Sequence, residues 1–191
     1  MGYICLPYNS VINFTVLPIQ LLHTENKLLE IIMSIKFATP AQSACYSKVE
    51  AWLNELYPIV RQPFATLPVF SIPLGSAIAM VEVMAWGEEE TIIATSSFVV
   101  TEVDMTPDLM HFLLSENAQS DFGVFSIDDF GNIRLHSTIV GSTCDRQKLK
   151  DAVTAVLAAA DNYDDQIVAL WGGKRALDRM ASKSTYSQTN S

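Results

Sequence analysis

The chain has 191 residues, of which 49% are hydrophobic and 17% are charged, and its formal net charge at pH 7 is −9. This length suits one domain with a buried core. No apolar run reaches the roughly 18 to 20 residues that span a bilayer. The composition therefore predicts a soluble globular protein without a membrane-spanning helix.

The acidic residues gather in the middle of the chain. Between Arg61 and Arg134 there is no Lys or Arg, whereas eleven carboxylates fall in the same stretch, with Glu88, Glu89 and Glu90 as their densest run. Nucleic acids are bound through Lys and Arg that neutralise phosphates, so this pattern argues against a nucleic-acid partner. A basic or hydrophobic protein surface is the better interpretation. The alternative is that the acids only keep the domain soluble.

Cysteines and the first residues bear on the compartment. Cys5, Cys45 and Cys144 are odd in number, widely spaced and without a CxxC pair, which is typical of a reduced, cytoplasmic protein. Residues 1–32 lack a basic opening region and are interrupted by polar residues, so a signal peptide is not expected. We expect 1–32 to be an N-terminal extension, which arises from start-site choice or forms an added helix.

The first patterned element is a helix. Thr39-Pro40 supplies an N-cap residue followed by proline at the first helical position. Apolar residues then recur at helical spacing up to Leu56, and Pro58 ends the pattern. A proline-spaced loop follows, in which residues 69–74 leave room for one further strand.

Two hairpins and a short helix are predicted next. Residues 77–86 read as a strand, and the turn at 87–90 leads into a second strand at 91–100. Thr106-Pro107 repeats the helix-start signal for a helix that ends before Asn117. A second pair of strands, at 122–127 and 133–140, is joined through a turn that contains Gly131 and Asn132.

The last predicted element is the longest helix. Ser142 and Thr143 offer N-caps, apolar residues recur from Leu149 to Trp171, and Gly172-Gly173 ends the helix. The Ser/Thr-rich residues 181–191 have nothing to bury, so we expect a disordered tail. The sequence thus predicts one α+β domain over residues 33–180, with the order α-β-β-α-β-β-α, or one strand more.

The strand at 77–86 is apolar on both faces, although a sheet with one covered face would alternate polar and apolar residues. Its small residues favour close packing under helices. Its other face is richer in Met and Trp and meets either a further element or a partner. The predicted partner-binding residues are Met80, Met84 and Trp86, together with Phe98 of the next strand.

Three segments of the second half resemble the YbjN-like family, which is described as putative bacterial sensory-transduction regulators and shares its fold with class I type III secretion chaperones. The segments are Asp121-Phe122-Gly123-Val124-Phe125, the stretch 135–144 (LHSTIVGSTC), and the stretch 160–168 (ADNYDDQIV) with Trp171-Gly172-Gly173. The resemblance covers roughly residues 40–176. It implies a twisted antiparallel sheet flanked by helices, dimerisation, a partly unfolded client bound along apolar grooves, and no catalytic residue.

Motifs for chemistry are weaker. Asp121-Phe122-Gly123 and Asp129-Phe130-Gly131 match a kinase triplet but lack the other kinase motifs, so they are interpreted as turns. The acids Asp161, Asp164 and Asp165 lack the alternation and glycine of a calcium loop. We expect no metal and no cofactor. The alternative function is a small enzyme that uses Cys144 with His136, or a carboxylate pair, with the thiol activated at a helix N-terminus.

Overall fold

The computed structural model describes residues 34–75, 77–121, 123–176 and 178. Predictions for residues 1–32 and for the tail at 181–191 lie outside these residues. The described elements, in chain order, are α2 (Pro40–Leu56), β1 (Val69–Leu74), β2 (Ala77–Trp86), β3 (Glu90–Thr101), α3 (Pro107–Gln119), β4 (Val124–Ile127), β5 (Ile133–Val140), the 3-10 turn η1 (Gly141–Thr143), α4 (Arg146–Trp171) and β6 (Lys174–Arg175).

Two helices begin where the sequence predicts. The Thr39 hydroxyl accepts a hydrogen bond from the Gln42 backbone N–H at 3.1 Å, and Thr106 accepts one from the Leu109 N–H at 3.2 Å. A proline follows each cap at the first helical position, where the missing N–H has no intrahelical acceptor to lose. The short side chain and the proline together fix both starts.

The predicted caps of the last helix are wrong. Asp145 caps α4 by accepting from the Lys148 N–H at 2.9 Å, while Ser142 and Thr143 lie in η1. Ser142 does not cap the helix because its hydroxyl and its N–H both donate to the carboxylate of Glu90, the first residue of β3. Gly172 ends α4 as predicted, with φ at 78°, in the left-handed region that favours glycine.

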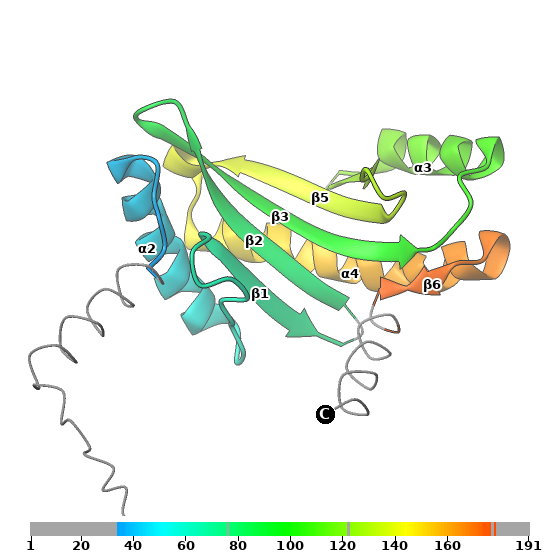
Figure 1. Cartoon of the computed structure of the whole chain (residues 1–191), viewed down its shortest axis with the longest axis horizontal. Helices are drawn as coiled ribbons and strands as arrows, with labels where there is room; N and C mark the ends of the chain where they lie inside the picture. The colour runs from blue at the N-terminus through cyan, green and yellow to red at the C-terminus, as the bar shows by residue number, and fades with distance from the viewer. Residues whose placement is uncertain (1–33, 76, 122, 177, 179–191) are drawn as a thin grey trace, which may run out of the picture. The chain divides into compact units, whose positions relative to one another are not determined.

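The strands form one antiparallel sheet in the order β1-β2-β3-β5-β4, with the short β6 paired to β3. Both predicted hairpins are present, and β1 is the further strand for which the sequence left room. The sequence did not predict β6 or the pairing of β3 with β5, which are separated along the chain by α3 and β4. Figure 1 shows that the sheet is twisted.

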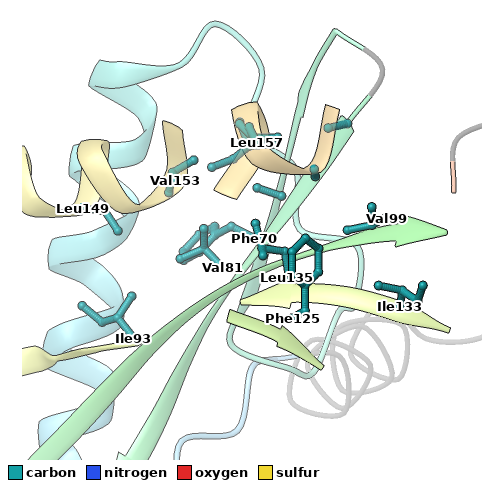
Figure 2. Close-up of a cluster of buried hydrophobic side chains, with 14 of the residues drawn as sticks. Phe70, Val81, Ile93, Val99, Phe125, Ile133, Leu135, Leu149, Val153 and Leu157 are labelled. Carbon is teal, nitrogen blue, oxygen red and sulfur yellow. The ribbon is translucent and has the colours of Figure 1, made fainter. Parts of the chain in front are cut away.

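The helices pack against one face of this sheet. In Figure 1, α4 runs behind β2 and β3; it contacts both strands and β5, and α2 contacts β2 and β3. Figure 2 shows Phe70, Val81 and Ile93 of three strands facing Leu149, Val153 and Leu157 of α4. Burial of such aliphatic and aromatic side chains is the main stabilising contribution to the fold.

Within the described residues, no helix combines the length and the hydropathy that crossing a membrane requires.

Candidate functional site

Successive residues of β2 and β3 point to opposite faces of the sheet. In β2 the odd-numbered Ala79, Val81 and Val83 are fully buried under the helices, and in β3 Ile93 and Val99 are equally buried. The even-numbered residues of β2, and those of β3 up to Phe98, point the other way and are half-buried or exposed. Beyond the irregular pairing between Phe98 and Val100, the alternation breaks and Val100 is buried. We call the side without α2 and α4 the open face.

The open face is hollowed into a groove of about 460 Å³, here called the open-face groove. Its floor comes from β2, β3 and β5, and β1 and β4 contribute at its sides. Its lining residues are Val69, Met80, Glu82, Met84, Ala94, Ser96, Phe98, Ser126, Arg134, His136 and Thr138. The strand register places them in rows, with Met80 opposite Ser96 and Ser96 opposite His136.

Among the residues that line the groove, Arg134 is the single one of the Lys and Arg types. Its Nη2 donates to the Ser96 hydroxyl at 2.8 Å, and its guanidinium lies 5.0 Å from the centre of the Phe98 ring. This ring is its cross-strand neighbour in the sheet. The Nε–H of Arg134 is buried and has no hydrogen-bond acceptor among the residues that the structure describes. The guanidinium therefore lies over an aromatic ring, and several of its N–H donors have no acceptor among the described residues.

His136 lies on the same strand and the same face as Arg134. Its Nδ1 is 3.2 Å from the Ser126 hydroxyl of β4. Burial lowers the pKa of His136 below its ordinary value, and the positive charge of Arg134 lowers it further. The imidazole is therefore neutral at neutral pH, and Arg134 carries the positive charge of the groove.

Of the residues singled out from the sequence, Met80, Met84 and Phe98 line the groove, with half-buried side chains. Trp86 does not line it, because it stands at the end of β2, where 56% of it is exposed. Arg134 was not predicted from the sequence, and His136 was predicted only as a residue of the alternative enzyme site. The alternation of β5, with buried Ile133 and Leu135, was the available signal that both face the open side.

The geometry does not bring Cys144 and His136 together, as the cysteine version of the alternative enzyme site would require. Cys144 is buried in the core beneath the helices, whereas His136 lies on the open face. Burial raises the pKa of the Cys144 thiol to about 11, although the sequence analysis considered activation at a helix N-terminus. Cys144 is 6% exposed, and its desolvation outweighs the nearby charges of Lys48 and Lys148, so this thiol is a packed core group.

A second apolar surface lies at the sheet edge formed by β4. A hollow of about 300 Å³ is lined by Met110, Leu113, Leu114, Asn117, Phe125, Ser126 and Ile127. The Asn117 side chain fixes α3 to this strand, since it accepts from the Phe125 N–H at 2.6 Å and donates to the Phe125 carbonyl at 3.1 Å. Leu114 is 69% exposed at its rim. We call this surface the α3–β4 hollow.

Residues 69–179, more than half of the chain, match the family TY-Chap1, described as "T3SS (YopN, CesT) and YbjN peptide-binding chaperone 1". The crystal structure of the ExsC–ExsE complex contains a similar chain, with 14% identity, a TM-score of 0.49, and coverage of 65% of this chain and 93% of that one. The search of curated proteins found no match. The family match confirms the predicted resemblance, and the chain belongs to the TY-Chap1 family of peptide-binding chaperones.

Proposed function

We propose that this protein is a non-enzymatic module that holds an extended, apolar segment of a partner protein in the open-face groove. The observation that carries the proposal is the groove itself, which lies on the sheet face opposite α2 and α4 and contains Met80, Met84 and Phe98. The match to a family of peptide-binding chaperones supports the same function.

The side chains of the groove suit clients of varied sequence. Met80 and Met84 have three rotatable bonds and a polarisable sulfur, so they can adapt to different partner side chains. An extended peptide presents every second side chain to a surface, at a spacing of about 7 Å. The even-numbered residues of β2 repeat at the same spacing, so an extended segment laid along the strands meets the groove with alternate residues.

The charge of the β2–β3 turn favours basic residues next to the held segment. Glu88 and Glu89 are exposed at this turn, at the end of the sheet where Trp86 also stands. Glu90 is engaged within the molecule, where it accepts from Ser142 and from the Thr91 N–H. Glu88 and Glu89 thus speed the approach of a basic flank, and this steering weakens at high salt.

The core thiols agree with a reducing compartment such as the cytoplasm. Cys45 and Cys144 are both buried and form no disulfide. Cys45 belongs to α2 and Cys144 precedes α4, and both side chains are part of the hydrophobic core. Buried free thiols are compatible with the reduced state in which cytoplasmic proteins are kept.

We also propose a homodimer through the α3–β4 hollow. β4 is an edge strand of the sheet, and it carries the exposed apolar side chains of Val124 and Ile127, with the exposed Leu114 of α3 lining the same hollow. An edge strand with apolar neighbours is a ready site for association with another chain. A second copy would present the same surface, as two-fold interfaces require.

Light scattering tests the dimer. The purified protein is expected at about twice 21.1 kDa, and Leu114→Glu is expected to reduce it to the mass of one chain. Leu170→Glu is the matched control, since Leu170 is similarly exposed at 62% but lies at the end of α4. A wild-type protein that stays at the mass of one chain at high micromolar concentration contradicts the dimer.

Peptide binding tests the groove. Peptides are selected from a displayed library of random dodecapeptides against the full chain, and their affinities are measured by fluorescence anisotropy. The double change Met80→Ser and Met84→Ser should weaken binding at least tenfold, because burying a Met side chain contributes about 1.5 to 3 kcal/mol. Leu114→Ser is the control outside the groove. Equal loss in both variants, or no selected apolar peptide, contradicts the proposed function.

A further inference from the structure

Arg134 differs from other cations of the molecule in what surrounds it. Arg146, Lys174 and Arg175 each pair with a carboxylate at the surface, at 3.2, 2.7 and 3.1 Å. Arg134 is half-buried, and the hydrogen bond that it makes goes to the neutral hydroxyl of Ser96. A guanidinium has five N–H donors, so most of its hydrogen-bonding capacity is unused.

Carboxylates of the described residues do not neutralise this charge by contact. The strand register places Glu82 opposite Ala94 and Arg134 opposite Phe98, which separates the two rows by four residues, or about 14 Å along the sheet. Asp128 interacts with the charge of Arg134 at a distance and forms no ion pair with it. Its carboxylate oxygens accept hydrogen bonds from the Phe130 and Asn132 N–H groups and from the Asn132 side-chain amide. The ion pairs among the described residues do not include Arg134.

The surroundings of Arg134 strengthen its attraction for an anion. The Phe98 ring lies 5.0 Å from the centre of the guanidinium, and the buried Nε shows that part of the group is already removed from water. A charge in such surroundings interacts more strongly than one at the open surface, and an Arg–carboxylate hydrogen bond is stronger than a neutral one. A partner that covers the groove without supplying an acceptor would bury this charge unpaired, which is unfavourable.

We propose that Arg134 binds an Asp or Glu side chain of the held segment and so selects partners that carry one acidic residue between apolar ones. The inference rests on the proposed function of the groove. A single carboxylate matches the single positive charge, whereas a doubly charged phosphate would also face Glu82 on the same surface. In an extended segment, the apolar residues that contact the groove beside the acid stand two positions away from it on either side.

This requirement refines the expected partner. Basic residues are favoured near Glu88 and Glu89 at the turn, and an acidic residue is favoured at Arg134. Phe98, the neighbour of Arg134, lies eight residues along β3 from Glu90, or about 27 Å. The two charge preferences therefore act on different parts of one segment and fix the direction in which it lies along the strands.

A displayed library of random dodecapeptides tests the inference without knowledge of the natural partner. Selection on the full wild-type chain should enrich Asp or Glu flanked by apolar residues at two-residue spacing. Selection on Arg134→Gln should keep the apolar residues and lose the acidic preference, and selection on Arg134→Glu should favour Lys or Arg instead. Arg146→Gln is the matched control, since it removes the same charge from an exposed site on α4.

Affinities of one selected peptide then quantify the contact. Replacing its acidic residue by the corresponding amide should weaken binding to the wild type about tenfold or more, the range of a charge-assisted hydrogen bond. The same replacement should change binding to Arg134→Gln by less than twofold, and it should keep its full effect on Arg146→Gln. Circular dichroism confirms that each variant is folded.

Two outcomes separate the inference from the function beneath it. Apolar peptides that are selected without an acidic preference, or that lose affinity equally on Arg134→Gln and Arg146→Gln, overturn the role of Arg134 and leave the groove intact. If neither the wild type nor Arg134→Gln retains apolar peptides from the library, both the role of Arg134 and the proposed function of the groove are overturned.

Discussion

The two faces of β2 and β3 show how one pair of strands serves two purposes. Towards the helices, the strands present Val81, Val83 and Ile93, which are at most 1% exposed. Towards the open face they present Met80, Met84 and Phe98, which are half-buried, with Arg134 and His136 of β5 beside them. Branched side chains fill a fixed core, whereas flexible and polar side chains leave a surface that a partner can complete.

The neighbours Ile92 and Ile93 provide the largest test of this comparison, since they have the same side chain on opposite faces. Ile93→Ala should lower the free energy of unfolding by about 2 to 5 kcal/mol, because it leaves a cavity in the core. Ile92→Ala, at a half-buried position, should cost less than half as much. Urea denaturation measures both values. Equal losses would show that the open face is packed as tightly as the core.

Asp164 of α4 is a buried carboxyl, 6% exposed. Burial raises the pKa of this carboxyl above its ordinary value, so the folded state binds its proton more tightly than the unfolded state. Its ionisation therefore costs stability at neutral pH, and the cost disappears as the pH falls through the folded-state pKa. Asp164→Asn should raise the melting temperature by a few degrees at pH 7 and by less at pH 4. A variant that is less stable at pH 7 would show that the carboxylate has a stabilising partner.

His136 reports on the charge of the open face. Burial and Arg134 both lower its pKa, so the unfolded state takes up a proton near pH 6.5 while the folded state does not. His136 therefore costs stability as the pH falls below about 6.5. In Arg134→Gln the pKa of His136 should rise, and NMR titration of the imidazole measures it. An unchanged pKa would mean that burial alone sets the shift.

The smallest effect is expected from the N-terminal residues. We propose that residues 33–180 fold as one domain, and the family match at 69–179 lies within that range. A chain that begins at Met33 should melt within a few degrees of the full chain in calorimetry. A large loss of melting temperature would show that residues 1–32 contribute to the core.

Local signals made most of the fold predictable from the sequence. Thr39-Pro40 and Thr106-Pro107 located two helix starts, and the mainly apolar run at 77–86, which has no Gly or Pro, located β2. The cap of α4 was mispredicted because Ser142 binds Glu90, which is 52 residues away in the chain. The strand β6 was missed because two residues carry no periodicity, and β3 determines its position through pairing.

The candidate site was predictable only in part. The Met and Phe residues of the groove follow from the two-sided apolar pattern of β2 and its neighbour. Arg134 could not be placed, because its position beside Ser96 and Phe98 depends on the pairing of β3 with β5. Trp86 followed the right alternation but stands beyond the groove, at the strand end. Alternation along a strand gives the face of a residue, and the order of the strands gives its neighbours.

The methyl groups of the methionines test the central claim most directly. Met80 and Met84 line the open-face groove, whereas Met110 lines the α3–β4 hollow. In a protein labelled with carbon-13 at the methionine methyls, a selected apolar peptide should shift the NMR signals of Met80 and Met84 and leave that of Met110 unchanged. A shift of Met110 alone would place the partner on the α3–β4 hollow and contradict the groove as the binding site.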